Sequence, residues 1–510
     1  MSRNATARSI IVPPPVNGWN TRDPISQMDP LYAVELENMF PGDGVVSLRN
    51  GFRYHSKSIG SSTVFSLASL EYGTVSKLIA VSSTGVVYDA TTASAAATDI
   101  SGGVTFATDY CMIRKFRDRL FIKPLISNND VYHYTGTGNI ALSAFTGPDT
   151  GAGADDKALY TFGSYRSRLY FAQADVPSLW YGGVDAITGA LTEFPLRAVL
   201  TKPFVNFAYV GGLTYQGQAA IDDALCVISD SGEGLLYGGD YPGSATWSLI
   251  ARFEIPPPMS VWGFANIGSN LVALTQQGIV SIQDAISGQS SSVGGYKTLS
   301  DAIQSQFVSA FSSSSPPFSL NFPIYLNYYP RGQMLVAGTG SGGSTQHYVM
   351  NTTTGAWCKF SQSCTAFSWA MWKSNLYFST SDGRVMKFDT GYFDEDPASE
   401  GNATSRTVVC RPAYNYFGDP SSVKRIGMVQ PYIYQSEGLS LTIGADMDFA
   451  DTTPTTTVTD TSDTAYKLWT PVIPMVGVGS ACSMRIEQTV TTKRISLQAM
   501  KITYESGGAY

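Results

Sequence analysis

The segment Lys77-Leu78-Ile79-Ala80-Val81, followed after a short polar turn by Gly85-Val86-Val87-Tyr88-Asp89, sets the pattern for most of this chain. It is typical of two short strands joined by a turn, because β-branched and aromatic residues fit a half-buried pleated surface and Gly supplies turn dihedrals. Similar units, each with a Leu in its first strand, recur along the chain. The anchoring leucines are Leu78, Leu120, Leu169, Leu225, Leu271, Leu335 and Leu376.

Successive anchors are 42, 49, 56, 46, 64 and 41 residues apart, close to the roughly 40–50 residues of a four-stranded propeller blade. A lone hairpin cannot bury both of its faces, whereas blades stacked around an axis bury them and leave only short edges. A β-sandwich or a meander would also contain recurring hairpins, but the regular spacing favours the propeller. The sequence therefore predicts an all-β fold with a six- or seven-bladed β-propeller over residues 61–400.

The interval of 64 residues predicts a helical insertion near residues 296–315. Ile303, Phe307 and Phe311 lie there at i, i+4 and i+8, which gives one apolar helix face, and Ser300 is a candidate N-cap. After the last blade the character of the sequence changes. Residues 405–510 are predicted to form a C-terminal β domain or an extension of a sheet.

Residues 1–60 lack the repeat and are predicted to form an N-terminal arm. Asp29-Pro30 is expected to begin a short helix that continues through Phe40. A turn at residues 41–44 then leads to a strand at residues 45–49, which the hairpin-type turn Asn50-Gly51 closes.

Composition limits the classes of function. The 510 residues carry a net charge of −7, and only 14% are charged, against about 25% in typical domains. A protein that grips nucleic acid by neutralising phosphates would show a basic excess. The six cysteines are scattered and are interpreted as free thiols in a reducing compartment. The sequence predicts neither a signal peptide nor a membrane span.

Residues that could carry chemistry do not form a recognisable constellation. The three histidines, His55, His133 and His347, lie in different regions, and the acidic segment from Asp446 to Asp451 lacks the Gly and Glu of a calcium loop. We therefore expect no catalytic residue, no cofactor, no metal site and no enzymatic activity. Residues 239–247 approximate the Asp-box turn of sialidase-type propellers, with the spacing from Asp240 to Gly243 one residue too long. They keep open an alternative, a propeller-type glycan-binding or glycan-hydrolysing virion protein.

Four arginines form matched pairs in consecutive units: Arg117 with Arg119, and Arg166 with Arg168. If the two units are in phase, these residues lie on the same rim of the propeller. They are candidate contacts with DNA or with acidic residues of a neighbouring subunit, and solvated turns of the repeat are the plainer interpretation.

The N-terminal segment Asn17-Gly18-Trp19-Asn20-Thr21-Arg22-Asp23-Pro24, together with residues 35–41 and 45–52, resembles the opening of tail hub or nozzle proteins of short-tailed bacteriophages. These are also called tail tubular or packaged-DNA stabilisation proteins, and the repeated hairpins resemble their propeller. Residues 417–420 and 424–426 resemble the entry to their terminal sheet. Within the arm, Trp19, Arg22, Phe40 and Arg49 are candidate docking residues, either on the chain's own propeller or on a neighbouring subunit.

The resemblance implies a structural ring subunit of a virion tail, made in the cytoplasm of the bacterial host. The ring is commonly a homohexamer, stacked below the portal and adaptor proteins. Packaged double-stranded DNA is retained in its lumen and passes through it during ejection, without sequence specificity. Tail fibres or tailspikes attach at the periphery.

Overall fold

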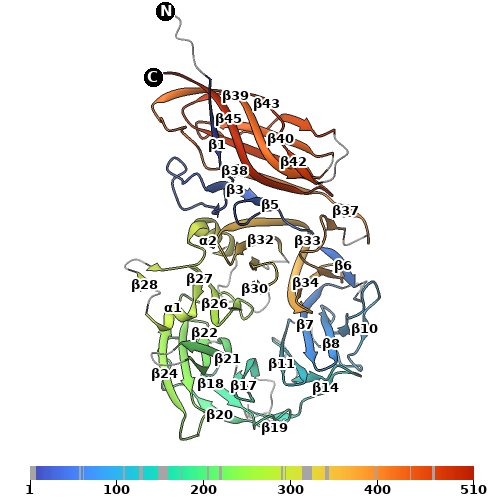
Figure 1. Ribbon diagram of the computed structural model, residues 1–510. Coiled ribbons are helices and arrows are strands. Elements are labelled where there is room, and N and C mark those ends of the chain that lie inside the picture. Colours follow the sequence, from blue (N-terminus) through green and yellow to red (C-terminus); the bar gives the residue numbers. More distant parts are fainter. Residues whose placement is uncertain are drawn as a thin grey trace, which may run out of the picture.

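The structure is a computed structural model, and it describes the chain except for residues 1–6, 57–58, 61, 107–109, 126–129, 148–158, 174, 204–205, 217–220, 289–290, 293–294, 313–323, 339–343, 397–398, 437, 462–465 and 510. The fold is all-β. Radially arranged sheets form the lower part of the molecule in Figure 1, and two long sheets from both ends of the sequence form the upper part. In the described part of the chain no helix is long and apolar enough to cross a membrane.

Five separate sheets make up a five-bladed β-propeller arrangement. The first comprises β7 (Val64–Tyr72), β8 (Val75–Ser82), β9 (Val87–Asp89) and β10 (Thr98–Asp99), and the second comprises β11 (Cys111–Phe116), β12 (Arg119–Pro124), β13 (Tyr132–Tyr134) and β14 (Ala141–Leu142). The third comprises β16 (Leu159–Tyr165), β17 (Arg168–Gln173), β18 (Ser178–Tyr181) and β20 (Thr192–Pro195). The fourth comprises β21 (Phe207–Gln216), β22 (Ile221–Ser229), β23 (Glu233–Gly238) and β24 (Ser248–Glu254), and the fifth comprises β25 (Phe264–Ile267), β26 (Asn270–Thr275) and β27 (Gly278–Ser281), followed by α1 (Ile282–Ile286).

Each anchoring leucine is buried, with at most 1% of its surface exposed, and in the five separate sheets it lies in the second strand of the blade. The last two, Leu335 and Leu376, lie in β31 (Met334–Gly338) and β34 (Asn375–Thr380), which belong to a thirteen-stranded sheet. Five blades form separate sheets, so the expected six or seven separate blades are not found. The physical reason is β33 (Trp357–Trp372), whose first part pairs with β32 (Ser344–Asn351) and whose second part pairs with β34.

The thirteen-stranded sheet continues from the propeller into the upper part. Its main path also contains β30 (Tyr325–Tyr329), β2 (Gly18–Trp19), β3 (Tyr32–Glu37), β38 (Arg406–Pro412), β44 (Cys482–Val490), β40 (Ser440–Met447) and β41 (Thr456–Thr459), while β35 (Val385–Lys387) and β6 (Arg53–Ser56) branch from it. A seven-stranded sheet lies beside it, made of β1 (Ala7–Val12), β4 (Met39–Pro41), β5 (Val46–Leu48), β39 (Ser422–Gln435), β42 (Lys467–Trp469), β43 (Ile473–Gly479) and β45 (Ile495–Ala509). Residues 405–510 are thus hydrogen-bonded to N-terminal strands through both sheets.

The short elements complete the fold. Three two-stranded sheets pair β15 (Phe145–Thr146) with β19 (Gly189–Ala190), β28 (Ser291–Ser292) with β29 (Gly295–Tyr296), and β36 (Asp394–Glu395) with β37 (Ala403–Thr404). The 3-10 helix η2 (Asp301–Ile303) and α2 (Gln304–Ser312) lie in the range expected for the helical insertion, of which residues 313–315 are outside the described residues. Ile303, Phe307 and Phe311 are buried as expected, but the Ser300 side chain makes no capping hydrogen bond.

The helix expected from Asp29 to Phe40 is wrong. Residues 32–37 form β3, which pairs with β2, β33 and β38, and residues 39–41 form β4. These neighbouring strands satisfy the backbone of β3, so tertiary pairing overrides a weak local helix preference. Nor does Asn50-Gly51 close a hairpin: β5 pairs with β4 and β45, whereas β6 pairs with β35. Residues 7–56 are consequently woven into the sheets instead of forming a detached arm.

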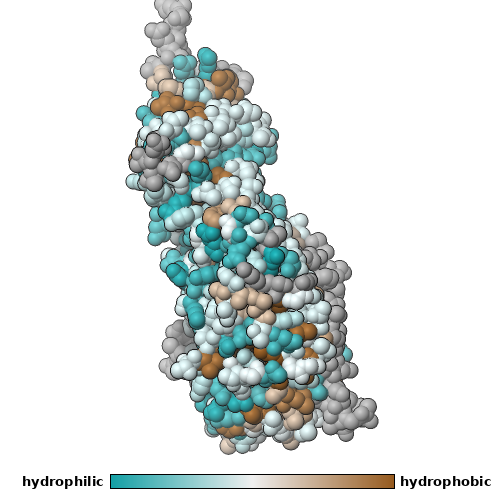
Figure 2. Space-filling view, turned by 90° about the vertical axis from the view of Figure 1, so that its right-hand side faces the viewer, coloured by the Kyte–Doolittle hydropathy of each residue, from teal (hydrophilic) through white to brown (hydrophobic). Residues whose placement is uncertain are grey.

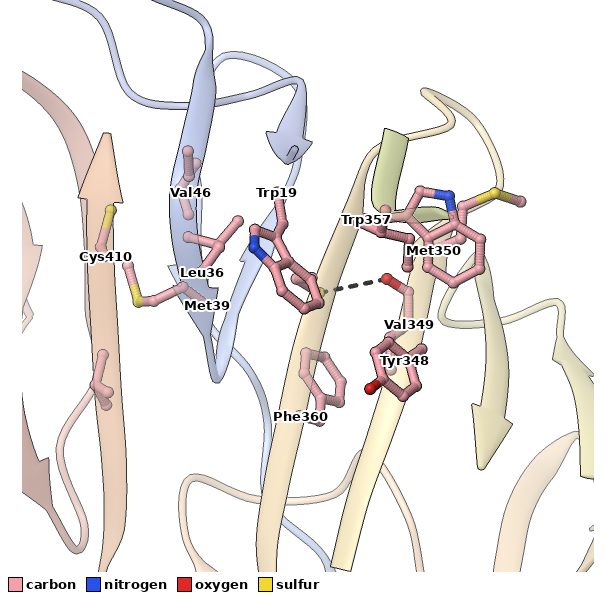
Figure 3. Close-up of a cluster of buried hydrophobic side chains, with 14 of the residues drawn as sticks. Trp19, Leu36, Met39, Val46, Tyr348, Val349, Met350, Trp357, Phe360 and Cys410 are labelled. Carbon is pink, nitrogen blue, oxygen red and sulfur yellow. Dashed lines mark hydrogen bonds between the residues drawn. The ribbon is translucent and has the colours of Figure 1, made fainter. Parts of the chain in front are cut away.

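One large core joins the two sheets of the upper part to the last repeats of the propeller. In Figure 3 the Trp19 side chain lies towards Tyr348 and Phe360, whereas the Met39 side chain extends towards Cys410. The Trp19 indole lies parallel to the Tyr348 ring, with 6.2 Å between ring centroids and 10° between planes. The N-terminal segment therefore lies between the propeller and the two sheets of the upper part, and it packs into their shared core.

Candidate functional site: the arginine-bearing rim of the propeller

Arg117 and Arg166 occupy equivalent tight turns in neighbouring blades. Arg117 lies between β11 and β12, and Arg166 lies with Ser167 between β16 and β17. Their φ angles are 56°, 45° and 56°, the left-handed values that two-residue hairpin turns adopt because these match the twist of the flanking strands. The two arginines thus occupy equivalent positions in consecutive blades, on the side of the propeller called the rim below.

Each of these arginines forms an ion pair with the next blade. Arg117 Nε lies 2.5 Å from Asp185 Oδ1, and Arg166 Nη1 lies 3.6 Å from Asp240 Oδ1. Both aspartates follow the third strand of the blade after the one that carries the arginine. The repeated ion pair therefore connects consecutive blades and neutralises much of the positive charge of Arg117 and Arg166.

A hollow of about 680 Å³ opens between these turns and the first strand of the fourth blade. Its lining brings both arginines together with Tyr165 and Asp223, and the Tyr165 hydroxyl shares its one proton between the carbonyl oxygens of Asp223 and Gly239, at 3.0 and 2.8 Å. The hollow thus combines two half-exposed cations with a carboxylate, a lining that suits a polar or mixed-charge partner.

The second arginine of each pair has a local role. Arg119 bonds to the neighbouring Asp118 at 2.9 and 3.0 Å. Arg168 donates to the carbonyl oxygen of Gly182 and lies 4.3 Å from the centre of the Tyr241 ring. These two residues hold the turns in shape, and the rim is presented by Arg117 and Arg166.

All four candidate docking residues have contacts inside their own chain. Trp19 donates from Nε1 to the carbonyl oxygen of Val34 at 3.0 Å, Phe40 lies edge-on to Phe360, and Arg49 is 4% exposed. Arg22 is half-exposed and forms ion pairs with Asp23 and with Asp301 of η2, and the hydrogen bond to Asp23 raises its pKa. This segment therefore docks on the chain's own propeller repeats.

The acidic residues that resembled a calcium loop are used for different purposes. Asp446 is buried against Arg411, Asp448 accepts hydrogen bonds from the backbone of Ser480 and Ala481, and Asp451 pairs with Arg485. Within the described residues, no group of three or more His, Cys, Asp or Glu side chains could hold a metal ion.

Asp240, the residue of the Asp-box-like turn, is also accounted for by local contacts. Its backbone N–H donates to Thr246 Oγ1, and its carboxylate accepts from the same hydroxyl at 3.3 Å while facing Arg166. Trp247 stacks on Tyr237 with 5.3 Å between ring centroids. The turn is thus a structural corner of the fourth blade.

The cysteines and histidines lie apart in the structure. All six cysteines are buried and free, and burial raises the pKa of the Cys410 thiol to about 12, so this thiol stays protonated at neutral pH. His347 is fully buried, and its Nδ1 lies 2.8 Å from the Tyr325 hydroxyl. Burial lowers the pKa of His347 to about 3, which keeps the ring neutral.

Sequence reasoning found the arginines of the rim but missed one of their partners, Asp185. A usable signal was present, because Asp185 and Asp240 both follow closely on the Tyr-containing third strand of their blades. Recognising it required knowing that these two loops lie beside the preceding blade, which is a tertiary fact.

No family model matches the chain, and no curated protein matches it. Solved structures that resemble it include an extracellular domain assigned to a one-component system of B. thetaiotaomicron, with a TM-score of 0.41 and 12% identity. That alignment covers 71% of this chain and 45% of the other, so this chain spans less than half of that protein. Another is YCF48 from Cyanidioschyzon merolae, with a TM-score of 0.39, 10% identity, and coverage of 66% and 98% of the two chains.

Proposed function

We propose that this chain is a structural ring subunit of a phage tail, a hub or nozzle protein that forms part of the DNA exit channel below the portal and adaptor. The observation that carries the proposal is a group of exposed apolar side chains on the outer side of the seven-stranded sheet, interspersed with Arg425, Lys501 and Glu505, which a subunit of an assembly would bury against a second copy. The resemblance of residues 17–24, 35–41 and 45–52 to such proteins supplies the kind of assembly.

This outer face is built by four adjacent strands, in the order β1, β45, β39 and β43. Strand register aligns Ser9, Thr503, Met428 and Pro474 in one row across the sheet, and Arg425 with Val478 in the next. Ile11, Val476 and Val478 expose 63%, 86% and 60% of their surface, which is unusual for large apolar residues on one sheet. Figure 2 shows apolar residues exposed at this upper end of the molecule. The outer face is defined here as Ile11, Met428, Pro474, Val476 and Val478 with the residues between them.

A groove of about 420 Å³ crosses the outer face where β39 carries a bulge between Ile426 and Met428. Burying apolar surface releases about 25 cal/mol per Å², and flat apolar sheet surfaces left open promote association. The edge strand β43 pairs only with β39 among the described strands. A second copy that covers this groove would bury the exposed apolar surface and shield the edge strand β43.

The finer architecture proposed for the propeller is a closed ring of seven units. The thirteen-stranded sheet would supply two of these units. The sixth would comprise β30, β31, β32 and the first part of β33. The seventh would comprise the second part of β33 with β34, β35 and β6. In support, β6 comes from the N-terminal segment and pairs with β35, so that one sheet would join the two ends of the propeller sequence. The second part of β33 also lies against β7 of the first blade, because Ser69 Oγ donates to the carbonyl oxygen of Met371.

The charge of the chain is compatible with a channel wall that DNA passes without being bound. The net charge is −7, and the cations of the rim are paired with aspartates. A wall of low positive charge lets a polyanion slide without being held. In the proposed assembly the ring is a homohexamer, its lumen lies between copies of the chain, and fibres or tailspikes attach at the periphery.

The test is whether the purified chain forms a ring. Light scattering coupled to size exclusion gives its mass, and negative-stain electron microscopy shows its shape, both alone and with portal–adaptor particles added as a template. A closed ring in either condition supports the proposal. A chain that stays monomeric alone and does not bind to portal–adaptor particles would refute it.

A further inference from the structure

A second cavity lies inside the propeller, away from the rim. This central cavity has a volume of about 130 Å³ and is lined by β7, β11, β25, β30 and β33. Three of these are the first strands of separate blades, and β30 and β33 belong to the last repeats. Since one buried water needs about 10–15 Å³ of such space, the central cavity has room for a small polyatomic ion.

The central cavity contains one charged side chain, Arg114 of β11. The Arg114 side chain is exposed to solvent, and desolvation by the strands around it lowers its pKa. Among the described residues the Arg114 guanidinium forms no ion pair, in contrast to Arg117 and Arg166, and Tyr209 is a titratable side chain that acts on it electrostatically. No Asp or Glu is among the lining residues.

Other donors in the same lining are also uncommitted. The indole N–H of Trp262 and the side-chain amide of Asn327 make no hydrogen bond with any described residue, and the indole N–H of Trp369 is buried without an acceptor. The lining hydroxyls, by comparison, are already engaged: Ser66 Oγ accepts from the backbone of Cys111, and Ser368 Oγ accepts from the backbone of Leu67. What remains is a cation surrounded by N–H donors.

We propose that the central cavity is a binding site for one small tetrahedral oxyanion, such as inorganic phosphate or sulfate, held by the Arg114 guanidinium with Asn327 and Trp262 as donors. A planar guanidinium presents paired N–H groups that match an oxyanion in two contacts at once. The buried indole N–H of Trp369, which lacks an acceptor, costs free energy that a bound oxyanion would restore. A positively charged lining that lacks any carboxylate selects against cations.

The experiment measures the thermal unfolding midpoint of the full chain in phosphate and in sodium chloride of equal ionic strength. A ligand that binds only the folded state raises this midpoint. We expect phosphate and sulfate to raise it more than chloride does, and the difference to disappear in Arg114→Gln. The matched control is Arg331→Gln, which removes an exposed arginine that bonds to Asn375 outside the cavity and should leave the phosphate effect intact.

Arg114→Gln should also keep the wild-type stability in chloride, because it replaces a solvent-exposed side chain that forms no ion pair. If near-UV circular dichroism shows that this variant does not fold, Asn327→Leu replaces it and should reduce the phosphate shift. An equal phosphate shift in the wild type and in the cavity variant would overturn the proposal, as would a wild-type shift no larger than that in chloride. An equal shift in acetate would overturn the assignment to a tetrahedral ion.

Discussion

Arg49 and Asp394 form a bidentate ion pair that is closed to solvent. Arg49 Nη1 and Nη2 lie 2.8 and 2.5 Å from the two carboxylate oxygens of Asp394, across 345 positions of sequence. Arg49 also donates to Asn38 Oδ1 at 2.7 Å and to the carbonyl oxygen of Ser361 at 2.8 Å. The pair therefore connects the N-terminal strands to the region where the propeller meets the two upper sheets. Arg406 makes a further contact with Asp394 at 3.3 Å.

Replacing Asp394 by Asn should destabilise the chain strongly, because it leaves two buried arginines without their counter-charge. Breaking one partner of a buried pair costs about 3–5 kcal/mol, and the loss should appear as a lower denaturant midpoint. The control is Asp301→Asn, which removes the exposed pair with Arg22 and should cost no more than about 1 kcal/mol. An equal loss of stability in the two variants would contradict the structural role of the Arg49–Asp394 ion pair.

His347 should make the chain sensitive to acid. Its pKa is about 3 in the folded state and about 6.5 when unfolded, because burial disfavours the charged ring. Between these values the unfolded state binds the extra proton, so the free energy of unfolding falls as the pH falls from about 6.5 towards 3, by up to roughly 4 kcal/mol.

His347→Gln, which does not titrate, should flatten this part of the stability profile measured by denaturant unfolding at a series of pH values. His133→Gln is the control, since His133 is only half-buried beside Ser143. A profile of His347→Gln that still falls as steeply as the wild type would show that other groups control the acid response.

Gly18 should not tolerate a side chain. Its φ is +80°, and a Cβ atom there would lie 2.4 Å from the backbone oxygen of Trp357, on the strand that β2 joins. Gly18→Ala should therefore force β2 away from β33 and lower the thermal midpoint by several degrees, as strained backbone substitutions do. Gly44→Ala, at a φ of +73° with no neighbour within 4 Å, separates backbone strain from steric clash, and its smaller loss is the expected result.

Val476→Asp should abolish self-association while leaving the fold intact. The side chain is 86% exposed on the outer face, so a carboxylate there costs nothing in the monomer but must be desolvated in an apolar contact. Sedimentation or light scattering should show a smaller species with an unchanged thermal midpoint. Val184→Asp, at a 60% exposed valine of the propeller, should assemble as the wild type does; loss of assembly in both variants would assign the effect to charge alone.

The ion pairs between blades should contribute little individually. Arg117 and Asp185 are 52% and 29% exposed in their side chains, and exposed pairs contribute about 0.2–1 kcal/mol. A double-mutant cycle with Arg117→Gln and Asp185→Asn should give a coupling energy in that range, reduced by salt. A coupling several times larger would mean that the rim is a rigid, desolvated contact.

Local sequence by itself determined the repeat. The seven leucines correctly marked seven buried strands, because a buried residue at a fixed place in a short hairpin leaves a periodic trace of apolar and turn residues. The apolar face of α2 was readable for the same reason. The matched arginines were placed on one rim because their position relative to the repeat was visible in the sequence.

Tertiary structure alone decided how these units connect. β33 serves two repeats, so strand counting could not separate the last units, and β3 became a strand because distant segments supplied its hydrogen-bond partners. Asp394 meets Arg49, and Arg114 comes to lie among Trp262, Asn327 and Trp369, although no local pattern marks them. Local propensity is written within a few residues, whereas pairing across hundreds of residues depends on which surfaces the whole chain brings together.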